Sequence, residues 1–557
     1  MSLTILEIQD LVVDLPAGAD RPHAVAGVSL ALERNEILCV VGESGSGKSV
    51  TARAVMGLLP APQLRASAGR VLFRGEDLLH APGARLRALR GNEISMIFQE
   101  PMTALNPLKT IGNQIDEALL VHTEMPKAQR LTRIMDRLAA VHLRDPERVV
   151  RSYPHQLSGG QRQRAMIAMA LALEPVVLIA DEPTTALDVT TQAQILFLLK
   201  EIQSQRHMGV LFITHDFGVV SEIADRVAVM QYGKVVEFGA TRQVLDAPQH
   251  AYTRALIAAI PSLVPGEKRR VPDAPTVLSV SGLEKAYRSG GSLLGRGARV
   301  THAARGVSLT LRQGETLGLV GESGSGKSTV ARCIARLTEA DGGSIMLEGT
   351  DLRLLSRKQL RPYRKRVQVI FQDPYGSLNP RHTVANQIAE GAIVHGMARH
   401  EAMAKAQELI ALVGLDPRAA GRYPHEFSGG QRQRIGIARA LALEPELLIA
   451  DEPVSALDVS VQAQVLKLLA DIRDRLHLTM LFITHDLRVA AQVCDSIAVM
   501  LHGEIVEFRP TAELFGSPEH AYTRELLAAV PGKTLGLLTD ATRNVAPLHA
   551  QPPDERA

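Results

Sequence analysis

The octapeptide GESGSGKS occurs twice in this chain, at residues 42–49 and 321–328. Both copies fit the pattern GxxxxGK[ST], in which glycines let backbone N–H groups close around phosphates while a lysine reaches the outer phosphates. An apolar run precedes each copy, at residues 37–41 and 316–320. These runs predict buried strands, and the residues after each lysine are compatible with a helix. A strand, a loop and a helix in this order direct the helix N-terminus at the phosphates, so each copy predicts a nucleotide site.

The rest of the chain is also repeated. HAVAGVSL at residues 23–30 returns as HAARGVSL at 302–309, and ADEPTTALDVT at 180–190 returns as ADEPVSALDVS at 450–460. A chain of 557 residues is too long for one hydrophobic core, so the repeat predicts two tandem α/β domains. The predicted limits are 1–262 for the first domain, 263–274 for a linker rich in proline and charge, 275–531 for the second domain and 532–557 for a disordered tail.

Charge and cysteine content exclude some classes of function. The 62 basic and 59 acidic residues give a net charge of only +3, which offers no electrostatic case for a nucleic-acid-binding protein. Cys39, Cys333 and Cys494 are far apart, so we expect core residues in a reducing compartment and no disulfide frame or zinc cluster. We find no apolar run of about twenty residues and no secretory signal. We therefore expect a soluble, cytoplasmic chain whose membrane role depends on partners.

Local patterns predict further parts of each domain. Alternation over residues 6–13, followed by GVSL, predicts an antiparallel β patch ahead of the first phosphate loop. Residues 102–151 have a helical pattern that predicts a helical subdomain. The residues on one face of this pattern, which we expect to pack in a core, are Leu131, Ile134, Leu138 and Val141.

An acidic pair follows an apolar strand in each half. Asp181 with Glu182, and Asp451 with Glu452, stand where open α/β sheets place their ligands. Hydrolysis of a nucleoside triphosphate requires an acidic group for Mg²⁺ and a group that orients water. We assign the metal role to the two aspartates and polarisation of the attacking water to the two glutamates. A lone acidic pair is more often a solvated turn, but repetition behind two phosphate loops favours the catalytic role.

Two further side chains of each phosphate loop complete this chemistry. We expect Lys48 and Lys327 to bind the β and γ phosphates, and the hydroxyls of Ser49 and Ser328 to hold Mg²⁺. A nucleoside triphosphate and Mg²⁺ are therefore the predicted ligands of each loop.

The pentapeptide LSGGQ at residues 157–161 returns as FSGGQ at 427–431. Ser158 and Ser428 each precede a helix-forming segment, so they predict N-caps whose neighbouring N–H groups face an anion. A simple helix cap would explain either copy alone. It does not explain why the same opening follows both phosphate loops.

Together, the phosphate loop, SGGQ, a strand ending in Asp-Glu and a later strand ending in histidine resemble the ATP-binding cassette (ABC) family. The resemblance covers nearly the whole chain apart from the linker and the tail. It implies two tandem P-loop nucleotide-binding domains, each with a RecA-like mixed sheet core, an antiparallel β patch and a helical subdomain. It also implies that glutamines sense Mg²⁺ and the γ phosphate, that histidines contact the γ phosphate and that aspartates couple the two sites. These pairs are Gln99 with Gln372, His215 with His485, and Asp188 with Asp458.

Cassettes of this family pack head to tail, which implies that both cassettes pair within this one chain. The SGGQ of one cassette would then complete the site of the other. The first site would combine Lys48, Asp181, Glu182 and His215 with Ser428 and Gly430, and the second Lys327, Asp451, Glu452 and His485 with Ser158 and Gly160. The predicted ATP-binding residues are Gly42, Ser44, Gly45, Gly47, Lys48, Ser49, Gln99, Ser158, Gly159, Gly160, Asp188, Tyr287, Gly321, Ser323, Gly324, Gly326, Lys327, Ser328, Gln372, Ser428, Gly429, Gly430 and Asp458. The predicted Mg²⁺ residues are Ser49, Gln99, Asp181, Ser328, Gln372 and Asp451.

Both copies keep the glutamate, the histidine and SGGQ, so the resemblance predicts two competent hydrolytic sites. One difference concerns the adenine. The family usually stacks an aromatic side chain on the base, and Tyr287 fits that position in the second copy, whereas the aligned residue of the first copy is Leu15. Loss of roughly 1 kcal/mol of stacking predicts looser ATP binding at the first site.

Segments beside these motifs look like the importer cassettes of the dipeptide, oligopeptide and nickel family. They are residues 100–119 and 373–391, and PQHAYTRALIAAIP at 248–261 with PEHAYTRELLAAVP at 518–531. The fusion of two such ATPases is similar to the fused ATPases of glutathione and of oligopeptide or microcin importers. An amphipathic helix end would explain HAYTR in one copy alone. Some relatives carry cysteines near this segment for an iron–sulfur cluster, and this chain does not, so no cluster is predicted.

The resemblance implies the ATP-hydrolysing motor subunit of an importer that drives uptake of peptides. Two integral-membrane permease subunits would dock around residues 101–114 and 374–387, a separate solute-binding protein would deliver the peptide, and no nucleic acid would bind. The chain would be peripheral, at the cytoplasmic face of the inner membrane.

Three alternatives are open. Nickel or another small solute is the alternative cargo within the same family. A tandem cassette that acts on ribosomes would normally have a long, charged helical linker, whereas this linker is short and forms turns. A DNA-repair cassette would be interrupted by zinc-binding cysteine pairs, and the three cysteines here are scattered.

Overall fold

The computed structural model describes residues 4–185, 187–266, 274–289, 299–455 and 457–532. Their contacts form two compact units, the first built mainly from Met1–Leu187 and Thr191–Ile260 and the second mainly from Pro261–Val530. Most of the predicted linker (267–273) and nearly all of the predicted tail (533–557) lie outside the described residues.

The first unit is built on a six-stranded sheet with the order β10-β9-β3-β8-β7-β6. Its neighbouring strands are parallel, except that β9 and β10 are antiparallel. A second sheet, β2-β1-β4-β5, is antiparallel. The strands are β1 (Thr4–Asp14), β2 (His23–Glu33), β3 (Ile37–Val41), β4 (Arg65–Phe73), β5 (Glu76–Asp77), β6 (Ile94–Ile97), β7 (Val177–Asp181), β8 (Gly209–Thr214), β9 (Arg226–Gln231) and β10 (Lys234–Ala240). The helices are α1 (Lys48–Val55), α2 (Gly83–Leu89), α3 (Pro101–Ala104), α4 (Ile111–His122), α5 (Lys127–Ala140), α6 (Pro146–Val149), η1 (Pro154–Gln156), α7 (Gly159–Ala170), α8 (Val189–Arg206), α9 (Phe217–Ile223), α10 (Thr241–Asp246) and α11 (Ala251–Ala258).

The second unit repeats this arrangement. Its mixed sheet has the order β16-β17-β18-β13-β19-β20, with β19 and β20 antiparallel, and its antiparallel sheet has the order β12-β11-β14-β15. The strands are β11 (Thr276–Ser289), β12 (Arg299–Arg312), β13 (Thr316–Val320), β14 (Gly342–Leu347), β15 (Thr350–Asp351), β16 (Val367–Ile370), β17 (Leu447–Asp451), β18 (Thr479–Thr484), β19 (Ser496–Leu501) and β20 (Glu504–Pro510). The helices are α12 (Lys327–Ile334), η2 (Leu352–Leu354), α13 (Arg357–Arg366), α14 (Val384–Val394), α15 (Arg399–Leu412), η3 (Pro417–Gly421), η4 (Pro424–Glu426), α16 (Gly429–Leu441), α17 (Val459–Leu476), α18 (Leu487–Val493), α19 (Thr511–Gly516) and α20 (Ala521–Ala529).

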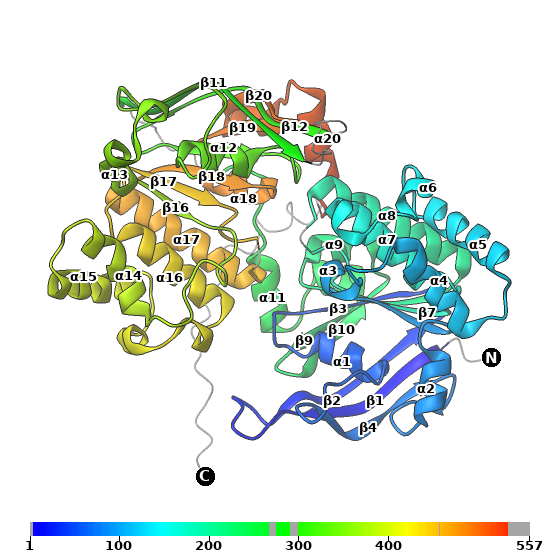
Figure 1. Cartoon of the computed structure of the whole chain (residues 1–557). Helices are drawn as coiled ribbons and strands as arrows, with labels where there is room; N and C mark the ends of the chain where they lie inside the picture. The colour runs from blue at the N-terminus through cyan, green and yellow to red at the C-terminus, as the bar shows by residue number, and fades with distance from the viewer. Residues whose placement is uncertain (1–3, 186, 267–273, 290–298, 456, 533–557) are drawn as a thin grey trace, which may run out of the picture. The chain divides into compact units, whose positions relative to one another are not determined.

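The mixed sheet of each unit lies between the antiparallel sheet and a layer of helices (Figure 1). Burial on both faces explains why its inner strands β3 and β13 are almost continuously apolar. In β3, Ile37, Cys39 and Val41 pack on the helical layer, whereas Leu38 and Val40 pack towards the antiparallel sheet. The α/β class is confirmed, and so are the mixed sheet core, the antiparallel patch and the helical subdomain of each copy.

The prediction that Leu131 is a core residue of the helical subdomain is wrong. Ile134, Leu138 and Val141 are buried, but Leu131, in the same helical pattern, is 53% exposed. The helix α5 packs against α4 and α7. Leu131 is near the N-terminal end of α5, and its exposure shows that the packed stripe begins one turn later.

The three cysteines lie in the core of their units. Cys39, Cys333 and Cys494 are free and buried, as expected for core residues. In the parts of the chain that the structure describes, none of the helices combines the length and the apolar character needed to cross a bilayer.

Candidate active sites

Each phosphate loop leaves the mixed sheet after a strand and enters a helix at its lysine. In the first unit β3 precedes the loop, and α1 begins at Lys48 with Gly47 as its N-cap. Gly47 has a φ of 104°, in the left-handed region, and a Cβ there would lie 2.6 Å from the carbonyl oxygen of Ala24. In the second unit Gly326 has a φ of 110°, and its Cβ would lie 1.9 Å from the carbonyl oxygen of Ala303. Both the conformation and the space therefore require glycine before the lysine.

The two loop lysines are buried and fold back onto their own loops. The ammonium of Lys48 donates to the carbonyl oxygens of Gly42 (2.7 Å) and Glu43 (2.9 Å). The ammonium of Lys327 makes the equivalent bonds in the second loop, both of 2.8 Å. Burial lowers the pKa of Lys327, and the nearby carboxylate of Glu452 opposes that shift. Carbonyl oxygens are uncharged partners for an ammonium, so phosphate oxygens can replace them.

A hydroxyl and a carboxylate meet beside each lysine. Ser49 Oγ donates to Asp181 Oδ1 at 2.8 Å, and Ser328 Oγ donates to Asp451 Oδ1 at 3.0 Å. The two aspartates end β7 and β17 and are buried. The pKa of each aspartate is raised, because the effect of burial exceeds the opposing effect of the hydrogen bond from the serine. Hydroxyl and carboxylate oxygens are the donors that Mg²⁺ prefers, so both pairs fit that ion.

The glutamate of the first unit gathers three polar side chains. Glu182 Oε2 accepts hydrogen bonds from Gln99 Nε2 (3.0 Å) and Thr185 Oγ1 (2.9 Å) and lies 3.3 Å from His215 Nδ1. Burial alone would raise the pKa of Glu182, but the hydrogen bond and charge of His215, followed by the charge of Lys48 and the hydrogen bond of Thr185, lower it to about 2. The side chain is therefore an ionised acceptor at neutral pH, held from three directions.

The glutamate of the second unit has the same glutamine and histidine but a different hydroxyl contact. Glu452 Oε2 accepts from Gln372 Nε2 (2.8 Å) and lies 3.3 Å from His485 Nδ1. Ser455 follows Glu452 by three residues, as Thr185 follows Glu182. Its hydroxyl donates to the backbone carbonyl oxygen of Glu452 (3.2 Å) and not to the carboxylate. Burial opposes both charges, yet each partner stabilises the other, so the pKa of Glu452 is lowered and that of His485 is raised.

Both glutamates have an unusual backbone conformation. Glu182 and Glu452 each have a φ of 48°, in the left-handed region. This conformation costs a non-glycine residue roughly 1–3 kcal/mol. It is stabilised here because each glutamate N–H donates to the neighbouring strand, to the carbonyl oxygen of Ile213 (2.9 Å) or of Ile483 (3.0 Å). The edge of the mixed sheet thus fixes the backbone that presents each carboxylate.

The SGGQ segments form N-caps, as predicted. Ser158 Oγ accepts from the N–H of Gln161 (3.3 Å), and Gln161 Oε1 accepts from the N–H of Ser158 (3.1 Å), which makes a capping box at the start of α7. The second copy forms the same box at the start of α16. The anion that we expect at each capped end stays a prediction.

The second glycine of each SGGQ segment packs against the next helix of its unit. A Cβ on Gly160 would lie 2.7 Å from Thr191 Cγ2 of α8, and a Cβ on Gly430 would lie 2.2 Å from Val461 Cγ1 of α17. Close helix packing therefore explains both glycines without any ligand.

The two aspartates expected to couple the sites lie at helix starts. Asp458 is the N-cap residue of α17, and Asp188 Oδ1 accepts a hydrogen bond from Thr190 Oγ1 at 2.9 Å near the start of α8. Their coupling role stays a prediction.

Strand register supports the alignment of Leu15 with Tyr287. Asp14, just before Leu15, pairs with His23 of the next strand. Ala286, just before Tyr287, pairs with His302 in the same way. Tyr287 is 41% exposed, and its ring centroid lies 5.5 Å from Lys285 Nζ. Its stacking on adenine stays a prediction.

Four side chains beside these sites were not predicted. Thr185 binds the first glutamate, and Arg21 donates to the carbonyl oxygen of Gly45 in the first loop. Tyr252 and Tyr522 place their hydroxyls on the first and second loops. The repeated HAYTR was a sequence signal for the tyrosines, whereas no repeated pattern includes Arg21.

Two family matches cover both halves of the chain. Residues 25–185 and 304–455 match the family described as ABC transporter, and residues 236–286 and 506–552 match the one described as oligopeptide/dipeptide transporter, C-terminal region.

Known proteins of similar sequence align with nearly the whole chain. The peptidoglycan transport ATP-binding protein YejF of Agrobacterium fabrum is 49% identical, over 94% of this chain and 96% of that protein. The glutathione import ATP-binding protein GsiA of Escherichia coli O157:H7 is 47% identical, over 95% of this chain and 89% of that protein. Among solved structures, the dimeric post-hydrolysis state of the ATP-binding cassette MJ0796 bound to ADP and Pi is 28% identical, with a TM-score of 0.38, and covers 42% of this chain and 98% of its own.

Within each unit, the structure brings together the lysine and serine of the loop, the glutamine, the acidic pair and the histidine. With the family matches, these clusters show that the chain belongs to the ABC transporter family and is an ATPase with two ATP-binding cassettes.

Proposed function

We propose that this chain is the motor subunit of an importer for small peptides. The observation that carries the proposal is the combination of two hydrolytic clusters with two copies of the C-terminal region of oligopeptide and dipeptide transporters. The relatives that transport or import peptidoglycan and glutathione support peptide-like cargo, because glutathione and peptidoglycan both contain short peptides. Hydrolysis in the cassettes would drive movement of this cargo through partner permeases.

Mg²⁺ would be held in each cassette by the serine hydroxyl and the adjacent aspartate. When bound, the ion would supply positive charge that offsets the charge of the phosphates. The lysine ammonium, now on loop carbonyls, would transfer to the β and γ phosphate oxygens. The glutamate carboxylate, ionised and oriented by glutamine and histidine, would accept a hydrogen bond from the attacking water and polarise it.

We further propose that the two cassettes, residues 1–262 and 275–531, complete each other's sites. The capped helix of each cassette, opened by Ser158 or Ser428, would meet the ATP held by the other loop. What supports this is that each half carries both a hydrolytic cluster and a separate helix N-terminus with an exposed serine. Fusion of the halves would guarantee that a partner cassette is always present.

Two permease subunits would bind the helical subdomains from the cytoplasmic face of the membrane, and a separate solute-binding protein would deliver the cargo. The segments after each glutamine expose large apolar side chains, as a docking surface requires. Met102 is 47% exposed, Leu108 85% and Tyr375 61%.

Uptake tests this proposal. A strain that lacks the gene would be supplied with labelled glutathione, a peptidoglycan tripeptide, a dipeptide or Ni²⁺, and complemented with the wild type or with the double variant Glu182→Gln/Glu452→Gln. We expect only the wild type to restore uptake of at least one peptide. Restoration of Ni²⁺ uptake alone would assign the cargo to the metal.

Affinity capture of the tagged chain from detergent-solubilised membranes tests the class of partner. We expect integral permeases to be recovered. Recovery of ribosomes or DNA without permeases would contradict the importer role.

A further inference from the structure

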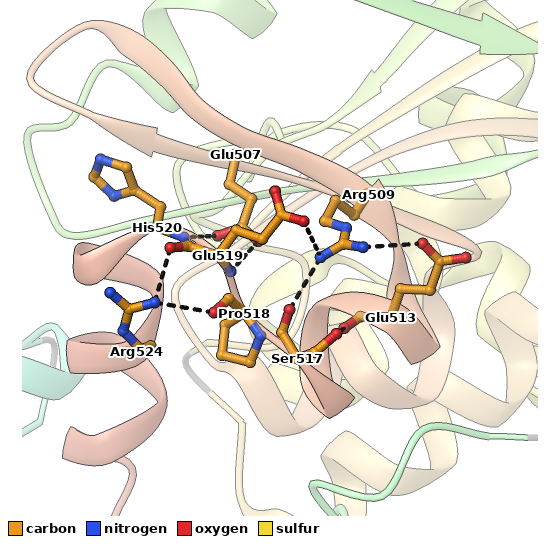
Figure 2. A network of polar contacts seen from close by, with 8 residues as sticks. All are labelled: Glu507, Arg509, Glu513, Ser517, Pro518, Glu519, His520 and Arg524. Carbon is orange, nitrogen blue, oxygen red and sulfur yellow. Dashed lines mark hydrogen bonds and ion pairs between the residues drawn. The ribbon is translucent and has the colours of Figure 1, made fainter.

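The C-terminal segment of the second unit is fixed to the mixed sheet by one carboxylate. Glu507, on β20, accepts hydrogen bonds from the backbone N–H groups of Glu519 (2.9 Å) and His520 (3.0 Å), just before α20 (Figure 2). Arg509, on the same strand, donates to the carbonyl oxygen of Ser517 (3.0 Å) and so ties the preceding turn to the strand (Figure 2). The start of α20 is therefore held at a set position on the sheet.

The first unit repeats the carboxylate contact. Glu237, on β10, accepts from the N–H groups of Gln249 (2.7 Å) and His250 (3.1 Å), just before α11. Because the same device occurs in both cassettes, it belongs to the repeated C-terminal region and not to one copy.

A tyrosine follows each of these anchors. His520 Nδ1 accepts from the N–H of Tyr522, and His250 Nδ1 from the N–H of Tyr252, both at 3.2 Å. Tyr522 and Tyr252 are 7% and 6% exposed. Burial raises the pKa of Tyr522, so its phenol stays neutral at physiological pH.

The hydroxyl of each tyrosine meets the first peptide group of the phosphate loop. The N–H of Glu322 donates to Tyr522 Oη at 3.1 Å, and the N–H of Glu43 donates to Tyr252 Oη at 3.2 Å. The carbonyl of the same peptide group belongs to the preceding glycine and accepts from the loop lysine, at 2.8 Å from Lys327 in the second unit and 2.7 Å in the first. One planar peptide group is thus bound on one edge by tyrosine and on the other by lysine.

The glycine of this peptide group has little freedom of its own. Gly321 has a φ of 150°, and a Cβ there would lie 2.2 Å from the carbonyl oxygen of Met500 on β19. Gly42 has the same φ, with its Cβ 2.2 Å from the carbonyl oxygen of Met230 on β9. The backbone of the loop entrance therefore packs directly on the neighbouring strand.

We propose that Tyr252 and Tyr522 are positioning residues for the phosphate loops. When the lysine moves from the loop carbonyls to the phosphates, the peptide group loses its partner on the carbonyl edge. The tyrosine then holds the N–H edge and keeps the loop entrance in the geometry from which the lysine reaches the nucleotide. The repeated C-terminal region thus braces the ATP site of its own cassette. The proposal needs the ATPase activity alone and not the identity of the cargo.

The test removes only the hydroxyls, in the full chain, with the double variant Tyr252→Phe/Tyr522→Phe. The KM for ATP should rise by about fivefold to tenfold while kcat changes by less than about twofold, because a partly buried N–H loses its acceptor and nucleotide binding is weakened. The matched control is Tyr363→Phe, whose hydroxyl donates to Thr350 Oγ1 at 3.1 Å away from the loop, and its KM should equal that of the wild type. An unchanged KM in the double variant, or a fall in kcat at unchanged KM, would overturn the proposal.

A second comparison separates positioning from general loss of structure. ATP affinity is measured by titration with a fluorescent ATP analogue in the Lys48→Ala/Lys327→Ala background, with and without the two Tyr→Phe changes. If the tyrosines act through the lysines, the Tyr→Phe changes should have little further effect on affinity in that background. A loss of affinity as large as in the presence of the lysines would contradict this role and assign the tyrosines to folding alone.

Discussion

The two cassettes agree at the phosphate end of the site and differ at its edges. The serine–aspartate, glutamine–glutamate and histidine–glutamate distances of the two units match within 0.2 Å, as 2.8 against 3.0 Å, 3.0 against 2.8 Å, and 3.3 Å in both. At the other end, Tyr287 of the second unit stands where the first has Leu15. The comparison indicates that the two copies share the groups that we propose act on phosphate and differ in the groups around them.

A smaller difference lies beside the glutamate carboxylate to which we assign polarisation of the attacking water. Thr185 donates to the carboxylate of Glu182, whereas Ser455 donates to the backbone carbonyl of Glu452. The carboxylate of the first glutamate therefore accepts one more hydrogen bond that favours its ionised form. The corresponding edges of the two mixed sheets thus present carboxylates with slightly different hydrogen bonds.

The largest expected effect is the loss of ATP hydrolysis when either glutamate is replaced. Unequal losses in the two variants would show that the two clusters do not have the same role. Glu182→Gln and Glu452→Gln should each reduce hydrolysis at the altered site by about 100-fold or more, since the group that polarises water is neutralised, while ATP binding persists. Single-turnover hydrolysis of radiolabelled ATP measures this. The control is Glu504→Gln, an exposed carboxylate on β20. Full hydrolysis in either single variant would show that the two sites are not equivalent.

The acid stability of the first unit should depend on Glu182. Its pKa is lowered from 4.5 to about 2 in the folded chain, so it contributes stability above pH 4.5 that is lost as the pH falls towards 2. The contribution is at most about 3 kcal/mol at neutral pH. The free energy of unfolding in urea should be measured for the wild type and for Glu182→Gln at several pH values. The wild type should lose stability relative to the variant as the pH is lowered. A difference independent of pH would contradict the assigned contacts.

The hydroxyls of Thr185 and Ser455 test whether the two glutamates differ in their acid transitions. Thr185→Ala should move the acid loss of stability to higher pH, because the ionised carboxylate loses a donor. Ser455→Ala should leave the acid transition unchanged, because its hydroxyl binds a carbonyl. Equal shifts in the two variants would mean that the hydroxyls do not distinguish the sites.

The signature glycines should differ in their tolerance of a methyl group. Gly430→Ala should destabilise the second unit by about 1–3 kcal/mol, since its Cβ would lie 2.2 Å from the stiff side chain of Val461. Gly160→Ala, with 2.7 Å to Thr191, should cost less. Thermal unfolding measures both. The control is Gly436→Ala in the same helix as Gly430, where the added Cβ meets nothing within 4 Å, and a loss there as large as at Gly430 would argue against the packing account.

Much of this site could be predicted because its residues belong to short local motifs. The strands β3 and β13 have the bounds of the predicted apolar runs, and Ser158 and Ser428 cap their helices as their sequence context indicates. Pairs such as Ser49 and Asp181 could be joined only because each lies in a motif with a known place at the edge of the sheet.

The rest depends on contacts between distant segments, which no local pattern encodes. Tyr522 reaches Glu322 across 200 residues of sequence, and the anchor that places it is a strand carboxylate. The left-handed conformation of Glu182 and Glu452 is set by a hydrogen bond to a neighbouring strand, and periodicity gives no sign of it. Leu131 fitted the helical period, yet the stripe that packs on α4 and α7 excludes it.

The most direct test of the account is ATP binding by the double variant Glu182→Gln/Glu452→Gln, measured by calorimetric titration with Mg²⁺. We predict two sites whose dissociation constants differ by about fivefold, the equivalent of about 1 kcal/mol of base stacking. Adding Leu15→Tyr should tighten the weaker site until the two constants coincide, whereas adding Tyr287→Leu should loosen the tighter one. Two equal constants at the start, or no gain from Leu15→Tyr, would contradict the claim that the two cassettes differ in how tightly they bind the base.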